Sequence, residues 1–171
     1  VEATELLAKR LNITPEEEKE AIRKATLKVD SLIYLQDAQD NDPCAVRMKT
    51  GDKLVTKLKY IGLNGSRNQL PEELVLNCHK NHGGHKDVYG RIKLAQPSNT
   101  ITTGCNNLSK GRFTHPWLNT GISIREAASL QTFPGDFVFL SNQTSQAKQV
   151  GNAVPIELGK ALINHIKTTI L

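Results

Sequence analysis

Long apolar runs and aromatic residues are what this sequence most clearly lacks. No apolar run approaches the roughly 18 residues that a membrane-spanning helix needs. The N-terminus has neither the basic region nor the apolar stretch of a signal peptide. Aromatic residues make up 5% of the 171 residues, although 38% are hydrophobic. We therefore expect about one ordinary domain with a lean core, outside the membrane.

Cysteine and methionine are also scarce. The three cysteines, Cys44, Cys78 and Cys105, are odd in number and widely spaced, which favours a reducing cytoplasm over a disulfide scaffold. The single methionine is Met48, and the sequence does not begin with one. We therefore expect a processed or excised piece of a longer protein.

Positive charge is concentrated in the middle of the chain. Residues 42–118 hold 12 Lys and Arg against 5 Asp and Glu, a net +7, whereas residues 1–41 carry −3 and residues 119–171 carry +1. A segment that meets a polyanion has this distribution. A solvated lysine-rich surface is the alternative.

The first segment of the chain is expected to be helical. Residues 5–11 fit one short helix, and Thr14 with Glu17 forms a capping box for a second helix that runs to about Lys28. Its faces are charged and its apolar positions few. We interpret it as a surface or connecting element.

A second capping box, Ser123 with Glu126, predicts a short helix that ends near Gln131. Residues 132–135 end this helix. Three phenylalanines just beyond it are expected to supply much of the local core: Phe133, Phe137 and Phe139.

The middle segment has weaker signals. Residues 54–61 fit a strand or a short helix equally well, and residues 71–74 fit a brief helical turn. The β-favouring run from Thr100 to Thr103 carries hydroxyls that are suited to phosphate oxygens. Arg91 is suited to a bidentate contact with guanine, and Arg112 adds charge to a glycine-containing loop. An ordinary strand and loop on a basic surface is the alternative for each.

One Cys and three His lie within eight residues: Cys78, His79, His82 and His85. These residue types can ligate zinc. Structural zinc sites, however, draw two ligand pairs from separate elements, and the sequence has no second cluster. We favour a loop that lies near phosphates and expect no metal.

Residues 149–155 are interpreted as a polar turn with a glycine, after which Pro155 opens the last helix. Free N–H groups and the positive end of the helix dipole at such a junction suit a carboxylate or a phosphate. The helix carries apolar residues at four-residue spacing: Leu158, Leu162, Ile166 and Ile170. We expect this face to be exposed, or buried in self-association, in the isolated chain.

Five segments, in this order, resemble the C-terminal third of DNA (cytosine-5) methyltransferases. They cover the target-recognition region and the last two family motifs, over about residues 60–165. The segments are 87–91, 97–103, 111–116, 125–134 and 149–155, the last reading Gln-Val-Gly-Asn-Ala-Val-Pro.

The resemblance implies an enzyme that flips a cytosine out of the duplex and transfers a methyl group from S-adenosylmethionine to carbon 5. The family's nucleophile loop, its Glu-Asn-Val motif and its glycine-rich cofactor strand do not occur in this sequence. Cys44 follows a proline, as the family's nucleophile does, but Asp42 and Ala45 stand where the family has other residues. We therefore expect no catalytic residue in this chain.

Carried over by position, Thr102 matches a threonine that contacts the DNA backbone, and Thr103 replaces a leucine. Asn152 and Ala153 match the motif that closes over the methionine end of the cofactor. The expected DNA contacts are Arg91, Thr100, Thr102, Thr103, Asn106 and Arg112. The expected cofactor contacts are Asn152, Ala153 and Val154.

The expected fold is mixed α/β: a small irregular strand-and-loop DNA-recognition domain flanked by helices, without the parallel-sheet domain that binds the cofactor. Its parts are a helical lead segment (1–41), the target-recognition region (42–122) and a C-terminal helical segment (123–171).

The resemblance implies a recognition fragment of a cytosine-5 methyltransferase from a restriction–modification system, inactive alone. Its expected partners are duplex DNA, an N-terminal catalytic domain and a second copy bound through the last helix. We expect it in the cytoplasm, at the nucleoid in a bacterium. The alternatives are a stand-alone DNA-binding module, either degenerate or regulatory, and the recognition subunit of a split methyltransferase.

Overall fold

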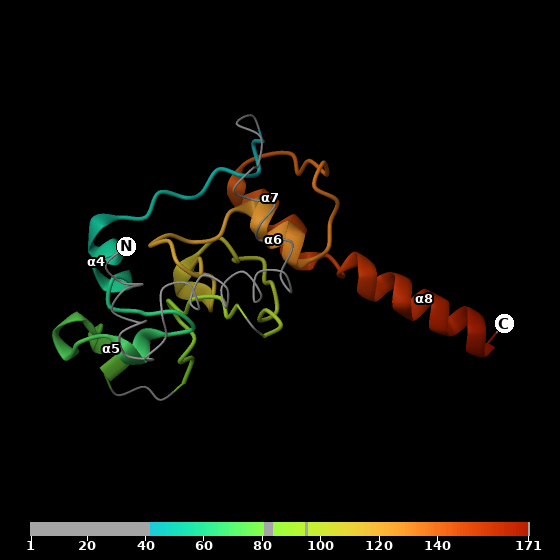
Figure 1. Cartoon of the computed structure of the whole chain (residues 1–171). Helices are drawn as coiled ribbons and strands as arrows, with labels where there is room; N and C mark the ends of the chain where they lie inside the picture. Colours follow the sequence, from blue (N-terminus) through green and yellow to red (C-terminus); the bar gives the residue numbers. More distant parts are fainter. Residues whose placement is uncertain (1–41, 81–83, 95, 171) are drawn as a thin grey trace, which may run out of the picture.

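Helices are the regular elements of the structure, a computed structural model that describes residues 42–80, 84–94 and 96–170 (Figure 1). The helices expected over residues 5–28 lie outside these ranges. The α-helices are α4 (Asp52–Leu58), α5 (Asn77–Lys80), α6 (Ile124–Leu130), α7 (Gln143–Asn152) and α8 (Ile156–Ile170). Short 3-10 helices are η1 (Arg67–Gln69), η2 (Glu72–Leu74) and η3 (Leu108–Lys110).

Strand pairing within the described residues is limited to two isolated bridges, from Thr114 to Arg91 and to Gly121. The β-favouring Thr100–Thr103 run forms no strand, because Cys105 N–H donates to the Thr102 carbonyl and turns the chain there. The mixed α/β class of the whole chain stays a prediction, since residues 1–41 are not described.

The ambiguous segment 54–61 is largely helical. Helix α4 begins after Gly51, with Asp52 in its first turn and Lys57 in its last, so both charges favour the helix dipole. Its buried residue Leu58 packs with Ile61, Tyr89 and Leu108 in a small cluster. The helical turn expected at residues 71–74 is confirmed as η2.

The capping box of α6 is confirmed. Ser123 Oγ accepts from Glu126 N–H, and a Glu126 carboxylate oxygen accepts from Ser123 N–H at 2.6 Å. The helix buries Ala127 and Ala128 against α7, whose Ala147 and Val150 belong to the same main core. Small residues on both helices allow this close packing.

The expected aromatic cluster also forms beyond α6. The ring centroids of Phe133, Phe137 and Phe139 lie 4.8–5.1 Å apart in tilted arrangements. Phe139 is buried and Phe137 is 45% exposed, so the cluster runs from the core to the surface.

Two adjacent residues of α6 anchor residues 42–47. Arg125 forms an ion pair with Asp42, and its backbone N–H donates to the Cys44 carbonyl. Glu126 pairs with Arg47. Burial would raise the pKa of Asp42, but hydrogen bonds from Arg125 and the Cys44 amide outweigh it and lower that pKa.

Arg91 is the hub of the loop region. It is 5% exposed and makes five side-chain hydrogen bonds, all to oxygen acceptors. The acceptors are the carbonyls of Leu58, Ile61, His115 and Leu118 and the side-chain oxygen of Asn119, at 2.6–3.0 Å. One guanidinium therefore joins the end of α4 to the 115–119 loop.

Arg112 is a second buried arginine, beside the first. Its Nη1 donates to the carbonyls of Asn64, Gly65 and Arg91, and its Nε and Nη2 donate to the Asp87 carboxylate. The two arginines thus satisfy carbonyls that a β-sheet would otherwise pair.

Helix α8 projects from the body of the molecule (Figure 1). Leu158, Leu162 and Ile166 are 51%, 54% and 48% exposed, which confirms the exposed apolar face. As expected, the helix starts directly after Pro155. No described helix has the length and hydropathy of a membrane span.

Replacing Arg91 should destabilise the fold far more than replacing an exposed cation. Arg91→Ala leaves several buried carbonyls without donors, each at a cost of about 1–3 kcal/mol, so we expect a loss of about 3 kcal/mol or more. Urea unfolding measures this loss of stability, and Lys53→Ala, at an exposed position of α4, is the control. Equal midpoints for the two variants would contradict the hub role.

Candidate functional site

The Thr102–Thr103 peptide lies directly against the last turn of α7. A Cβ placed on Gly151 would lie 2.2 Å from the Thr102 carbonyl carbon and 2.3 Å from the Thr103 nitrogen. Only glycine allows such an approach of two backbones. The structure thereby brings a predicted DNA contact and the predicted cofactor segment together, across nearly fifty residues of sequence.

The rest of the loop follows α7 toward its other end. Asn106 Nδ2 donates to the Gln143 carbonyl at 3.5 Å. Ile101 and Cys105 point into the main core, whereas Thr100, Thr102 and Thr103 are exposed. The three threonines therefore present their side chains to solvent from a loop that is anchored on both sides.

The polar turn expected at residues 149–155 was partly wrong. Gln149 to Asn152 form the last turn of α7, and only residues 153–155 link it to α8. The Gln131 side chain fixes this link, because its Nε2 donates to the carbonyls of Val150 and Ala153 at 3.1 and 3.2 Å.

The start of α8 offers fewer free donors than expected. Ile156 N–H donates to the Gln131 carbonyl, and Glu157 N–H donates to the Thr132 hydroxyl. These contacts satisfy groups that would otherwise bind an anion. Of the expected cofactor contacts, Asn152 and Val154 are exposed and Ala153 is half-buried, so the segment offers one open wall.

The DNA contacts expected of Arg91 and Arg112 are not available in this arrangement. Arg91 is 5% exposed and Arg112 is 8% exposed, and their guanidinium groups donate to acceptors within the protein. Burial also lowers the pKa of Arg91. We therefore assign these two arginines to the fold, and the exposed threonines with Asn106 remain as candidates.

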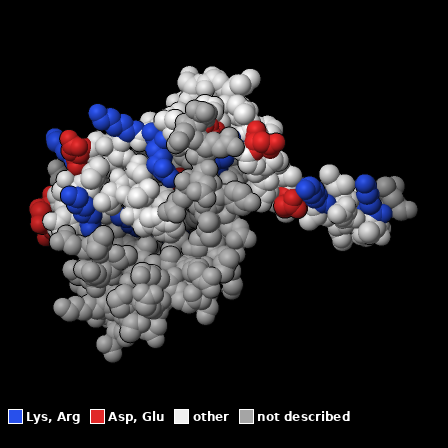
Figure 2. All heavy atoms as spheres, turned by 45° about the horizontal axis from the view of Figure 1, so that its top comes forward, with Lys and Arg blue, Asp and Glu red and all other residues white. Residues whose placement is uncertain are grey.

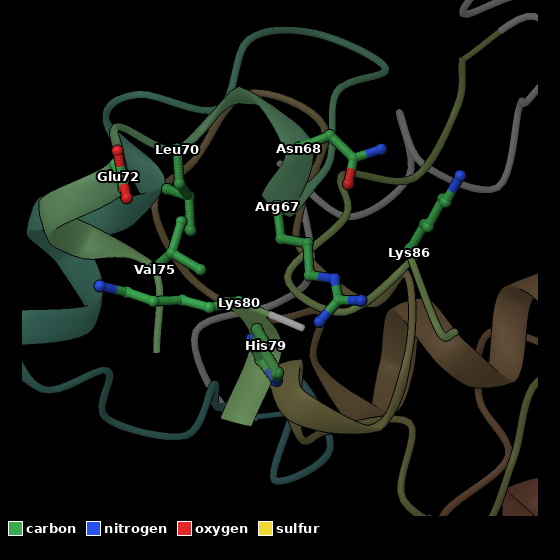
Figure 3. Close-up of a pocket in the computed structure, with 8 residues that line it drawn as sticks. All are labelled: Arg67, Asn68, Leu70, Glu72, Val75, His79, Lys80 and Lys86. Carbon is green, nitrogen blue, oxygen red and sulfur yellow. The ribbon is translucent and has the colours of Figure 1, made fainter. Parts of the chain in front are cut away.

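A cavity of about 410 Å³ is lined by residues of η1, η2 and α5 and by neighbouring loop residues (Figure 3). Its lining residues are Arg67, Asn68, Leu70, Glu72, Val75, His79, Lys80 and Lys86. In Figure 3 the Arg67 guanidinium lies between the side chains of Lys80 and Lys86. Arg67 is buried and donates to the Gly84 carbonyl, so the exposed Lys80 and Lys86 provide the positive charge that makes this hollow suited to an anion.

On the face shown in Figure 2, further Lys and Arg side chains lie at several places on the body, and α8 carries its own.

The structure describes part of the cluster of Cys78 and three histidines that was considered for metal binding. No group of three metal-binding side chains occurs among the described residues, and His82 lies outside them.

A buried charged cluster supports the 111–116 loop. His115 Nδ1 accepts from the N–H groups of Trp117 and Leu118, and its Nε2 lies 3.6 Å from a Glu126 oxygen. Burial, with Arg47 and Arg91 nearby, lowers the pKa of His115 to about 3. His115 is therefore neutral at pH 7, and the charge of Glu126 is balanced by Arg47 instead.

Comparison with known proteins shows the family of the chain. A family model described as C-5 cytosine-specific DNA methylase matches residues 6–168. The chain belongs to this DNA methylase family. Because the match runs through most of the chain, the threonine loop and the Gly151 segment can be considered as parts of one DNA methylase.

Two relatives of this chain are named as type II enzymes. The type II methylase M.HgiDII of Herpetosiphon aurantiacus is 45% identical over 103 residues, which cover 57% of this chain and 29% of that protein. The putative type II methyltransferase M.MJ0563P of Methanocaldococcus jannaschii is 28% identical over 147 residues, 82% of this chain and 42% of that protein. The chain thus matches less than half the length of these two relatives.

Three residues of the site were missed from the sequence: Gly151 as a contact point, Gln131 as the clamp of the link, and His115 as a buried neutral base. Gly151 had a usable signal, since glycine inside a helix disfavours the helix unless a close contact requires it. Gln131 had none, because it binds the distant carbonyls of Val150 and Ala153. The neutral state of His115 had none either, because it depends on burial in the fold with Arg47 and Arg91 nearby.

The neutral state of His115 should make the fold sensitive to acid. The unfolded chain takes up a proton at His115 near pH 6.5 and the folded chain only near 3, so stability falls as pH falls through this window. Between pH 7 and 5 we expect the wild type to lose about 2 kcal/mol more than His115→Asn, which keeps an acceptor near the Nδ1 position. Urea unfolding at both pH values measures this, and parallel losses would contradict it.

Proposed function

We propose that this chain is the target-recognition and C-terminal part of a cytosine-5 DNA methyltransferase of a type II restriction–modification system. The parent enzyme would transfer methyl from S-adenosylmethionine to carbon 5 of cytosine in duplex DNA. The observation that carries the proposal is the contact of Gly151 with the Thr102–Thr103 peptide. It joins the two segments that resemble the family's DNA contact and its cofactor wall.

The exposed threonines are suited to the DNA backbone. Hydroxyls of Thr102 and Thr103 can donate to phosphate oxygens, and such contacts fix register on the duplex without reading sequence. The basic cavity with Lys80 and Lys86 would add electrostatic attraction at a second place. Base reading would then fall to other side chains of the recognition region, because Arg91 and Arg112 are buried.

The residues at the end of α7 fit one wall of a cofactor site. Asn152 contributes an exposed amide and Val154 an apolar side chain that is 61% exposed, which together suit a ligand with polar and apolar parts. S-adenosylmethionine would supply the methyl group there. Gln131 holds this wall in place through the Val150 and Ala153 carbonyls.

The three thiols support the proposal that the chain is inactive alone. Cys44 is buried, with its thiol directed at the Phe139 carbonyl, and burial raises the pKa of Cys105 to about 11. A buried thiol is a poor nucleophile. Cys78 is exposed, but it lies in the segment of the basic cavity, far in sequence from the cofactor wall. The nucleophile would come from a catalytic part outside this sequence.

The test is a paired measurement on the isolated chain. Incubated with duplex DNA and methyl-labelled S-adenosylmethionine, it should transfer no label, yet it should bind the duplex with an affinity that falls steeply with salt. The logarithmic slope should be about −0.9 for each phosphate neutralised. Robust methyl transfer would refute the proposal that the chain lacks a catalytic part. Failure to bind duplex DNA at low salt would refute the recognition role.

A separately encoded catalytic chain is the second candidate arrangement. The same contacts would then belong to the recognition subunit of a split enzyme, and labelled methyl transfer should appear on mixing with that partner. A stand-alone DNA-binding module has no use for the cofactor wall at residues 152–154. The exposed Asn152 and Val154 beside a fixed link therefore favour the methyltransferase readings.

The apolar face of α8 is proposed as the docking surface for the catalytic part. Leu158, Leu162, Ile163 and Ile166 are each about half exposed, on a helix that leaves the body. Contiguous exposed apolar faces on proteins mark interaction sites. Without the catalytic part, two copies of the chain would cover these faces against each other.

A charge on this face should therefore abolish self-association. We expect the wild-type chain to form dimers at micromolar concentration and Leu162→Glu to be monomeric, since a buried carboxylate without a partner opposes association. Sedimentation velocity measures both. Asn164→Glu, on the opposite face of α8, is the matched control and should behave as the wild type; a monomeric wild type would exclude self-association.

A further inference from the structure

Gly151 lies inside a regular helix, so its need for glycine is not conformational. It is the ninth of the ten residues of α7, and its backbone is not in the left-handed region. A Cβ there would overlap three backbone atoms of the neighbouring loop: the Thr102 carbon and oxygen and the Thr103 nitrogen, at 2.2–2.4 Å. Backbone atoms cannot rotate away as a side chain can, so the loop or the helix would have to shift.

Both sides of this contact are held in place. On the helix side, Val150 is fully buried in the main core and Gln131 binds its carbonyl. On the loop side, Ile101 and Cys105 are buried in the same core on either side of the two threonines. The loop therefore cannot move away from α7 without exposing core residues, and an added methyl group would displace the Thr102–Thr103 peptide locally.

We propose that Gly151 is a positioning residue for the DNA-backbone contact of Thr102 and Thr103. It seats their peptide on α7, next to the Asn152–Val154 wall, so that the hydroxyls and the wall keep one fixed relation. This inference rests on the proposed function, because it assigns those hydroxyls to phosphates of duplex DNA. Gly151 itself touches neither DNA nor cofactor.

Gly151→Ala tests the inference in the whole chain. With the threonine hydroxyls displaced, we expect duplex affinity to fall about tenfold and the salt slope to stay unchanged, because a neutral hydroxyl releases no counterions when it binds a phosphate. Gly159→Ala is the matched control, because it makes the same change in α8, where a Cβ meets nothing within 4 Å. The control should match the wild type in affinity and slope.

A second variant separates positioning from general damage to the fold. Thr102→Val with Thr103→Val removes the hydroxyls and keeps the backbone packing, and it should give the same loss of affinity. Adding Gly151→Ala to this double variant should then lower the affinity no further, because the contact is already lost. Titration to saturation gives the active fraction of each protein, and thermal unfolding shows that each is folded.

The outcomes are distinguishable. If the wild type does not bind DNA, the proposed function fails and this inference fails with it. If the wild type binds and Gly151→Ala binds with the same affinity, only the inference fails. A Gly151→Ala variant with a lower active fraction but an unchanged affinity of that fraction would make Gly151 merely structural. If Gly151→Ala does not fold, an unchanged affinity of the double valine variant would overturn the inference.

Discussion

The guanidinium of Arg91 stabilises the loop region because it donates hydrogen bonds to backbone carbonyls that a β-sheet would pair in other proteins. Loops that pass through a protein interior carry carbonyls that must find donors. Arg91 supplies donors to the end of α4 and to the 115–119 loop at once, and no carboxylate is among its five partners. Its charge is thus stabilised by carbonyl and amide oxygens, which a lysine, without the planar fork, could not bind in the same number.

Arg112 extends this arrangement toward the surface. It binds the carbonyl of Arg91 itself and ends on the Asp87 carboxylate, whose side chain is half exposed. The two arginines therefore form a chain from the interior to solvent, in a region with isolated bridges rather than strands. A loop region built in this way can vary its exposed side chains while a few buried donors hold its course.

Local chemistry was the part of the structure that could be predicted from the sequence. Ser123 and Glu126 satisfy each other within one turn, so their spacing alone predicts the start of α6. Arg91 shows the opposite case. An arginine that reads a base and an arginine that binds loop carbonyls look the same in sequence, because the acceptors lie 24–33 residues away in the chain. Gly151 was taken for a turn for the same reason: the loop that requires it lies almost fifty residues earlier.

The projecting helix α8 has a thermodynamic consequence for assembly. A helix of fifteen residues is close to the length at which isolated helices are only marginally stable in water, and Gly159, its fourth residue, weakens it further. Its first turn is satisfied by Gln131 and Thr132, so nucleation is provided by the body of the protein. A partner that binds the apolar face would also stabilise the remaining helical turns. Docking would then be coupled to helix formation, with a heat-capacity change larger than the contact area alone predicts and an affinity below what that area suggests.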